Sequence, residues 1–451
     1  MADRVGASRR CLAVHANGRL PRRAVAGFAL GSLGPGVYST VPTVLLLYFC
    51  TEVLGIAPAV AAAVVFVPKA WAIAWDPVVG AWSDRARTPR GRRAPFLLGG
   101  SVAVAASFAL LFNVPDAAAG ITIAWVAVVY FIMASAYSLF AVPYVAIPAE
   151  ISPLPAERER LLAWRMGFSM AGVLVGAGLA PHIVQWAGGG RRGYGVMSLL
   201  VAVLCLVAML TTYRTVRRYH VTDIVAAPPV GGPMAGLRRI SGNKGYVRLW
   251  LVYLLALSGA SLFTATVPYF VTRVLQQDEG AAGTALLALL CATIACLPAW
   301  AAALRRHDGW TVLGVAVAGY VIVAAAFLLL PRGESGGVAL GLYALLGVPF
   351  AGLQLVPFAL LAHIAHAAGR REEGLYTGVW TAGEKLALAI GPAAAGVGLA
   401  LTGYVPGAAA QAPRTLSALQ ALMALGPTLF LLPSLLLVLG RRKPEPTGGI
   451  V

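Results

Sequence analysis

Apolar segments long enough to cross a bilayer recur along the whole chain, and they limit the possible folds more than any other feature of the sequence. A helix of about 20 apolar residues spans the hydrocarbon core of a membrane. Charged residues make up only 12% of the 451 residues, about half of their usual share in soluble domains. The sequence therefore predicts an all-α membrane protein with twelve spans. We place these spans at residues 25–52, 57–82, 95–114, 120–148, 162–187, 194–213, 247–272, 282–304, 311–330, 338–366, 374–403 and 416–439.

The net charge of +18 is distributed according to topology. Of the 35 Lys and Arg residues, 28 fall in the N-terminal tail and after the even-numbered spans, counting Arg165 and Arg248 just inside the spans that follow, and Lys69 and Lys385 fall deeper inside spans. This asymmetry is the positive-inside signature. We therefore expect a multi-pass protein of the inner (plasma) membrane with both termini cytoplasmic, membrane lipids as partners, and no nucleic acid. The basic residues of the opposite side are Arg191, Arg192, Arg273, Arg332 and Arg414.

The longest hydrophilic segment separates two halves of six spans each. The halves echo each other weakly, with VPYVAIPAE (142–150) in the fourth span and VPFALLAH (356–363) in the tenth. Repetition of this kind is typical of transporters whose site lies near the membrane midplane. We expect a basic cytoplasmic tail (1–24), a six-helix bundle (25–213), a cytoplasmic linker (214–246), a second six-helix bundle (247–440) and a cytoplasmic C-terminal tail (441–451).

Ionisable residues inside the spans are the strongest functional signal, because each costs about 2.5–3.5 kcal/mol on insertion scales. Asp76 lies about 12 Å from the end of its span, at a rise of 1.5 Å per residue. Lys69 is seven residues earlier and on the same helix face. A carboxylate opposed by burial and favoured by a nearby cation can take and release a proton. Asp76 is therefore a candidate coupling residue, with a purely structural ion pair as the alternative.

Further polar and aromatic side chains are candidates for lining a cavity. Arg165 just inside the fifth span is equally compatible with an interfacial anchor, whereas Lys385 lies deeper. Aromatic residues in spans also serve as core or interfacial packing. The cavity candidates are Lys69, Arg165, Lys385, Tyr144, Gln354 and Trp380.

Two histidines, His363 and His366, are three residues apart and share a helix face. No third ligand with suitable spacing accompanies them, so a solvated or hydrogen-bonded pair is favoured over a metal site. We expect no cofactor and no metal.

The segment WDPVVGAWSDRARTPRGRRAPF (75–96) ends its span among arginines and then starts the next helix with a proline. Its charges fix topology, but their arrangement also predicts a charge-lock hinge. We expect a cytoplasmic gate that includes Asp84, Arg85, Arg92, Arg93 and Glu150.

This segment resembles the Asp-Pro…Gly…Asp-Arg…Gly-Arg…Arg-Pro block of the glycoside–pentoside–hexuronide:cation symporters. That family is a branch of the major facilitator superfamily and includes the melibiose permeases. Three further stretches agree with it, at residues 28–56, 136–165 and 369–391. The resemblance runs from about residue 25 to residue 440. It implies the major facilitator fold, with two six-helix halves around a central cavity.

The cation site carries over only in part. By this resemblance Asp76 matches the second of two helix-II acids, and Ser138 matches a cation-site hydroxyl position. The first acid falls on Ala72 and a neighbouring polar position on Trp75. Sodium needs several oxygen ligands, whereas proton coupling needs one titratable group. We therefore favour H⁺ over Na⁺.

The substrate site also carries over in part. The resemblance matches a sugar-site arginine to Arg165, and a span-11 threonine and lysine to Thr381 and Lys385. Two acids that hold a galactoside fall on Gly36 and Ala141. Their loss leaves a more positive cavity, which favours an anionic solute such as a hexuronide.

These observations together predict a secondary active transporter, a proton symporter for a sugar or glycoside-like solute that works by alternating access as a monomer. An uncoupled facilitator or a lysolipid translocator of the same fold is the alternative, because relatives of the family move lysolipids and Ala72 fits a loss of coupling. A membrane-embedded enzyme or receptor is remote, since the chain has no phosphate loop, no HExxH and no GxSxG.

Overall fold

The computed structural model is helical throughout the residues that it describes, which are 20–86, 88, 92–151, 154–219, 238, 240–333, 336–368 and 373–440. Much of the expected tails and linker lies outside these residues. The helices of the first half are α2 (Arg22–Ala29), α3 (Leu33–Val41), α4 (Pro58–Arg85), α5 (Ala94–Phe112), α6 (Ala119–Ile151), α7 (Pro155–Leu174), α8 (Ala180–Trp186) and α9 (Gly190–Tyr219). Those of the second half are α11 (Lys244–Tyr269), α12 (Glu279–Arg306), α13 (Gly309–Ala326), α14 (Gly336–Ala368), α15 (Glu373–Leu401), α16 (Pro413–Leu425) and α17 (Thr428–Leu439).

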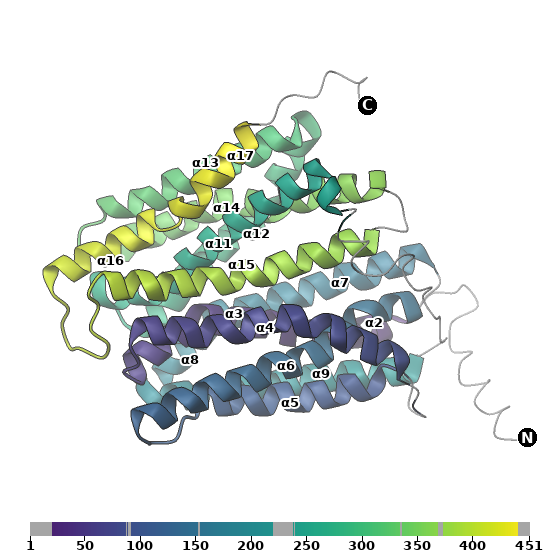
Figure 1. Ribbon diagram of the computed structural model, residues 1–451, viewed down its shortest axis with the longest axis horizontal. Coiled ribbons are helices and arrows are strands. Elements are labelled where there is room, and N and C mark those ends of the chain that lie inside the picture. Colours follow the sequence, from purple (N-terminus) through teal and green to yellow (C-terminus); the bar gives the residue numbers. More distant parts are fainter. Residues whose placement is uncertain are drawn as a thin grey trace, which may run out of the picture.

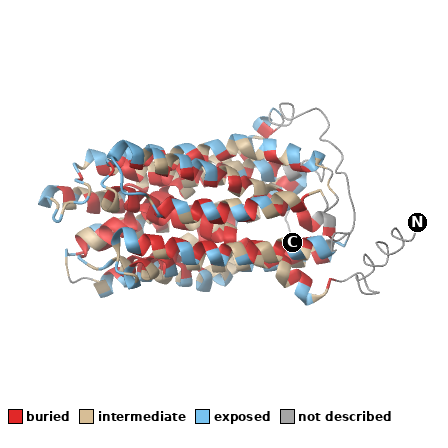
Figure 2. Ribbon diagram, turned by 90° about the horizontal axis from the view of Figure 1, so that it is seen from below, coloured by how far each residue is buried: buried red, intermediate tan, exposed pale blue. Residues whose placement is uncertain are grey.

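Twelve helical segments of the described chain are long and apolar enough to cross a membrane, which confirms the predicted fold class. Buried residues gather on the inner faces of the helices and exposed residues on their outer faces (Figure 2). The outer faces carry large apolar side chains, among them Leu329 and Leu401, each 84% exposed. Apolar side chains in these positions suit contact with lipid.

Several spans are not continuous α-helices. In the first span, α2 and α3 are separated by a tight turn at Leu30–Ser32, and a π-helical turn follows at Pro42–Leu46. Proline removes a backbone donor and glycine weakens a helix, and this span holds both in GSLGPG (31–36). Gly426 and Pro427 divide the last span into α16 and α17 in the same way.

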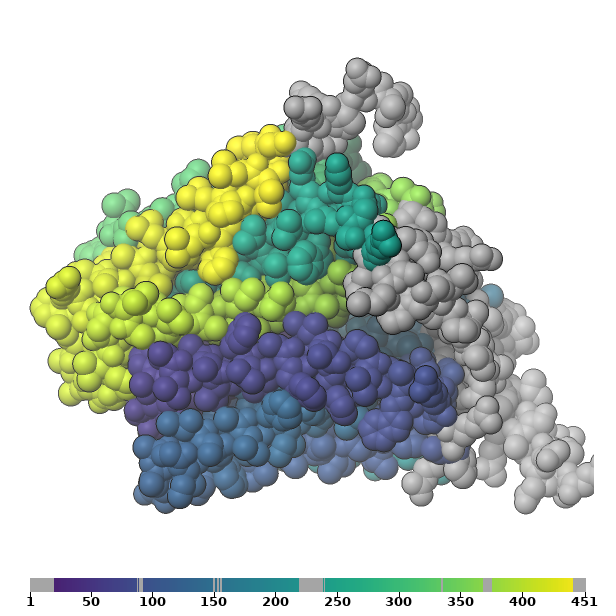
Figure 3. Space-filling view, in the orientation of Figure 1, coloured from purple at the N-terminus to yellow at the C-terminus, as the bar shows by residue number. Residues whose placement is uncertain are grey.

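The helices form two bundles that lie against each other (Figure 1). Helices α2 to α9 make one and α11 to α17 the other. Helices α4 and α15 pack along most of their length, and their surfaces meet in a continuous seam (Figure 3). We call the end that holds residues 47–57 the distal end, and the end that holds residues 20–22, 86 and 92–93 the proximal end.

The bundles are joined more closely at the distal end than at the proximal end. Helix α12 packs on α8 and on the π-helical turn Val175–Leu179, which form the distal part of the fifth span. Helix α7, the proximal part, adds no comparable packing on α12 among the described residues. A hollow of about 460 Å³ runs along α7, lined by Ala163, Trp164, Gly167, Phe168 and Ala171. The molecule is therefore more open toward its proximal end.

Candidate functional site

An ion pair at membrane depth joins the two bundles. Asp76 of α4 accepts a hydrogen bond from the Lys385 ammonium of α15. The two side chains are 23% and 21% exposed. The second carboxylate oxygen of Asp76, Oδ1, is buried and has no hydrogen-bond partner within the described part of the chain. Two residues that the sequence marked separately are thus placed in direct contact.

Aromatic rings form one wall beside this pair. Tyr137 of α6 stacks on Tyr38 of α3, with ring centroids 3.8 Å apart. The Lys385 nitrogen lies 5.7 Å from the centre of the Tyr137 ring, within the range of a cation–π interaction. The ammonium therefore has a carboxylate on one side and a neutral ring on another.

Lys69 makes a different contact between the bundles. It is buried, and its ammonium donates to the Thr43 hydroxyl at 2.7 Å and to the Leu388 carbonyl of α15 at 3.0 Å. The Leu388 carbonyl lacks its usual helix donor, because that donor would be the N–H of residue 392, which is a proline. Lys69 thus supplies from the first bundle a hydrogen bond that Pro392 removes from the second. The prediction that Lys69 binds solute stays a prediction.

Arg165 lies near the aromatic wall of the ion pair. Its guanidinium carbon is 5.3 Å from the centre of the Tyr144 ring. Tyr144 is itself buried, and its hydroxyl donates to the Phe28 carbonyl at 2.9 Å and lies 2.7 Å from Ser32 Oγ. Arg165 forms no ion pair with a carboxylate of the described residues. No carboxylate of the described residues therefore neutralises its charge, and the prediction that Arg165 binds solute stays a prediction.

The remaining predicted cavity residues take varied positions. Thr381 is exposed one turn before Lys385 and donates to its own helix, at the Thr377 carbonyl. Ser138 is buried and donates to the Ala134 carbonyl at 3.3 Å. Gln354 is half-buried in α14. Trp380 is buried and stacks on Tyr253 in the core of the second bundle, with ring centroids 4.3 Å apart.

The structure also explains why an acid is absent at Gly36. Helices α3 and α7 approach closely there, and a Cβ on Gly36 would lie 3.0 Å from the Cα of Gly172. A side chain of any size would force the helices apart. Small residues allow this kind of backbone contact between membrane helices.

The arginine-rich segment forms a lock within the first bundle. Asp84 at the end of α4 pairs with Arg93 at the start of α5, at 2.9 Å. Arg93 also donates to the Pro143 carbonyl of α6 at 3.3 Å. Arg85 is exposed and Arg92 half-buried, whereas the Glu150 side chain lies outside what the structure describes. These contacts tie α4, α5 and α6 together at the proximal end.

His363 and His366 are exposed near the proximal end of α14. The described residues contain no group of three or more His, Cys, Asp or Glu side chains that could hold a metal ion. That part of the chain therefore gives no support to a metal site at the two histidines.

A second ion pair between the bundles lies at the distal end, and the sequence analysis missed it. Glu52 follows α3 in a π-helical turn, and Arg273 follows α11 in another. The signal that could have revealed the pair is a short repeat, YFCTEVL at 48–54 and YFVTRVL at 269–275. The fifth residue of the repeat is Glu52 in the first copy and Arg273 in the second, so the two copies carry opposite charges there.

Twelve spans in two bundles, with ion pairs between the bundles, define the fold of a secondary transporter. A crystal structure of the nucleoside transporter NupG, solved for a single-substitution mutant, superposes with a TM-score of 0.69 and 12% identity, over 92% of this chain and 100% of that one. This likeness establishes the major facilitator fold.

The family follows from the sequence comparison. The profile described as MFS/sugar transport protein matches residues 27–439. The chain therefore belongs to the glycoside–pentoside–hexuronide:cation symporter family, as its motifs indicated, and is a multi-pass membrane transporter. It is 25% identical to the glycoside/cation symporter YagG of Escherichia coli (strain K12), over 89% of this chain and 87% of YagG. It is 24% identical to the sphingosine-1-phosphate transporter MFSD2B of Mus musculus, over 95% and 91% of the two chains.

Proposed function

We propose that this transporter is a proton-coupled symporter of a small anionic solute. The observation that carries this proposal is the Asp76–Lys385 ion pair, which joins the two bundles at membrane depth. Lys69 and Arg165 place two further cations near the same seam, and neither pairs with a carboxylate of the described chain. Lys69, Arg165 and Lys385 outnumber the neighbouring carboxylates of Asp76 and Glu384, and this excess of positive charge favours an anion.

The ion pair provides a simple coupling mechanism. When Asp76 takes a proton, its charge disappears and the Lys385 ammonium is free to bind an anion. The site then holds one proton and one anion more than before, so its net charge is unchanged. Because an unpaired charge inside the protein is costly, each ligand favours the binding of the other, which is the condition for symport.

Sodium fits this site less well than a proton does. Ala72, one turn before Asp76, is buried and offers no oxygen. Hard cations require several oxygen ligands. The Asp76 carboxylate, which already has an ammonium bound to it, is suited to proton exchange.

Lys69 would then hold the geometry of the pair. Its bond to the Leu388 carbonyl supports the part of α15 that Pro392 weakens, three residues from Lys385. The positive-inside rule places the proximal end in the cytoplasm. The open hollow along α7 then faces inward, with Asp84, Arg93 and their neighbours at the cytoplasmic gate.

The proposal is tested by uptake into proteoliposomes driven by a pH gradient, with a hexuronide as the first solute and a neutral glycoside beside it. We expect Asp76→Asn to abolish accumulation against a gradient while exchange of internal for external solute continues. Asp116→Asn, a carboxylate outside the seam, serves as the matched control and should accumulate solute normally. Accumulation by Asp76→Asn would exclude Asp76 as the coupling residue, and equal uptake of the neutral glycoside would exclude the anion preference.

A phosphate-bearing single-chain lipid is the second candidate solute. The similarity to a sphingosine-1-phosphate transporter favours it, and so does the hollow along α7, which is lined by the rings of Trp164 and Phe168. Thermal stability of the purified protein separates the candidates, because a ligand at about 100 times its Kd stabilises the folded state by about 2.7 kcal/mol. Stabilisation by lysolipid alone would select the lipid, and stabilisation by a uronide would select the sugar acid.

A further inference from the structure

The distal ion pair belongs to a duplicated segment. Residues 48–54 read YFCTEVL and residues 269–275 read YFVTRVL, so five of the seven positions are identical. Each copy ends the first span of its half. The two copies differ at the third position, where one has Cys50 and the other has Val271, and at the fifth, where one has Glu52 and the other has Arg273.

The two copies also share an unusual backbone. Each contains a π-helical turn, at Phe49–Val53 and at Phe270–Val274. Each is followed at the equivalent position by a residue with positive φ, Gly55 at 69° and Gln276 at 53°. Isolated π-helical turns occur frequently at functional sites. A non-glycine residue in the left-handed region is uncommon, so the surroundings must hold Gln276 there.

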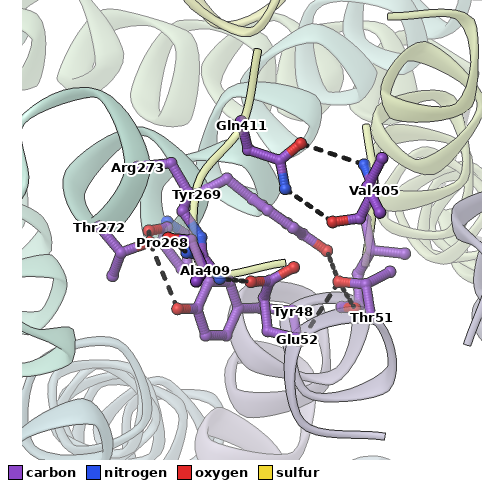
Figure 4. A network of polar contacts seen from close by, with 11 residues as sticks. Tyr48, Thr51, Glu52, Pro268, Tyr269, Thr272, Arg273, Val405, Ala409 and Gln411 are labelled. Carbon is purple, nitrogen blue, oxygen red and sulfur yellow. Dashed lines mark hydrogen bonds and ion pairs between the residues drawn. The ribbon is translucent and has the colours of Figure 1, made fainter. Parts of the chain in front are cut away.

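The copies face each other and exchange equivalent contacts (Figure 4). Tyr48 of the first donates to Thr272 of the second, at 3.3 Å. Tyr269 of the second lies 2.6 Å from the Thr51 hydroxyl of the first. Such reciprocity is the mark of contact across a two-fold axis. A residue close to such an axis meets the equivalent residue of the other copy. Two like charges there would repel each other, whereas Glu52 and Arg273 carry opposite charges and form an ion pair.

The contact is buried and closes the distal end. The Glu52 side chain is 4% exposed and that of Arg273 is 23% exposed. Arg273 also donates to the Ala409 carbonyl, at 3.5 Å, in the loop between α15 and α16. Glu279 at the start of α12 is near enough to Glu52 and Arg273 to interact electrostatically. Arg273 is therefore the one cation that neutralises this cluster among its described residues.

We propose that the two copies form a latch that closes the distal entrance and must separate for the transporter to open on that side. This rests on the proposed function only in assuming alternating access. Separation returns both charges to water, so opening costs less than breaking a permanently buried pair. The latch therefore selects one conformation without preventing the other.

A native thiol lies beside the latch, because Cys50 is near enough to Tyr269 of the second copy to interact with it electrostatically. Cys50 occupies the third position of the first copy and is fully buried. A buried thiol is shielded both from reagent and from the water that stabilises the thiolate, which is the form that reacts. Alkylation of Cys50 by N-ethylmaleimide should therefore be slow while the latch is closed and fast once it opens.

We would measure this rate in detergent-purified protein in which Cys11, Cys205, Cys291 and Cys296 are replaced by alanine. We expect Glu52→Gln and Arg273→Gln to raise the rate about tenfold, since each removes an interaction made only in the closed state. The exchange variant, Glu52→Arg with Arg273→Glu, restores the pair across the pseudo-axis. Its rate should return to within about twofold of the parent.

The control is Asp116→Asn, which breaks an exposed distal ion pair with Arg191 within the first bundle (3.4 Å). It should leave the Cys50 rate unchanged. If the single variants react at the parent rate, or the exchange variant reacts as fast as they do, the latch is overturned. If a charge variant fails to fold, Tyr48→Phe with Tyr269→Phe replaces it, and an unchanged rate there overturns the latch equally. The assay needs no solute and no gradient, so an error in the proposed substrate or coupling ion leaves it valid.

Discussion

Two ion pairs cross the same seam, and they are built in opposite ways. Asp76–Lys385 has side chains that are 23% and 21% exposed. Both carboxylates leave one buried oxygen without a hydrogen-bond partner within the described chain, Oδ1 of Asp76 and Oε1 of Glu52, so the two pairs differ in exposure and in their surroundings. Glu52–Arg273 has a carboxylate that is 4% exposed and is flanked by two reciprocal hydrogen bonds. A pair whose acid is partly exposed can change its protonation and partner. A pair whose acid is buried between two segments that also hydrogen-bond to each other holds one conformation. The difference favours a coupling role for the first pair and a gating role for the second.

The largest expected difference between the two ion pairs is in how much stability the protein loses when the basic partner of each pair is removed. Arg273→Met leaves the Glu52 carboxylate buried without a partner, and breaking a buried pair in this way costs about 3–5 kcal/mol. Lys385→Met leaves the Asp76 carboxylate without its partner, but water reaches this carboxylate more easily. We therefore expect Lys385→Met to lower the free energy of unfolding by less than half as much as Arg273→Met. Unfolding in detergent by a denaturant titration measures both variants. Equal losses would mean that the two pairs do not differ as we argue.

The next effect concerns the hydrogen bond from Lys69 to Leu388. Lys69→Met strips a helix carbonyl of its donor, which costs about 1–3 kcal/mol. Pro392→Ala restores the N–H that this carbonyl normally receives. In the Pro392→Ala background, Lys69→Met should therefore cost about 1 kcal/mol less than in the parent chain.

The same double-mutant cycle carries a functional control. If Lys69 acts through α15, we expect Lys69→Met to lower the maximal rate of transport and Pro392→Ala to restore part of that rate. If Lys69 instead binds the solute directly, the two substitutions will be additive in stability and the KM will rise without rescue.

We expect the smallest losses of stability when the tyrosine hydroxyls of the latch are removed. Tyr269→Phe removes a buried hydrogen bond of 2.6 Å to Thr51, and Tyr48→Phe removes one of 3.3 Å to Thr272. Each should cost about 0.5–1.5 kcal/mol, with the larger loss for Tyr269→Phe because its bond is shorter and more deeply buried. Thermal unfolding of both variants tests the order, and a larger loss for Tyr48→Phe would contradict it.

The sequence predicted the membrane-spanning architecture well because hydropathy is a local property. Span length and composition follow from bilayer thickness alone, so twelve spans could be counted without any knowledge of their neighbours. It also marked Asp76 and Lys385, since an ionisable group inside an apolar span is conspicuous by itself. What it did not predict was that they pair with each other, because they are 309 residues apart in the chain.

For other residues too, the sequence marked the position and only the tertiary structure showed the contacts. Lys69 stays a candidate for binding solute, and the structure adds a contact that the sequence did not indicate: its ammonium donates to a carbonyl whose helix donor is removed by Pro392 in another span. Trp380 was a cavity candidate, and its ring packs in the core of the second bundle. The rotation of each helix about its axis decides these outcomes, and a sequence reports that rotation only weakly when nearly all of its faces are apolar.

The latch combines features that the sequence shows with a contact that only the tertiary structure shows. Both copies of the motif, and the opposite charges within them, are readable in the sequence. Their meeting depends on tertiary packing, because the turn Pro42–Leu46 packs on α11 and so brings the two first spans together around a common axis. The spans, the family and the positions of the charges could be established from the chain of residues alone. The partner of each charge could not, since electrostatic pairing depends on separation in space and not along the chain.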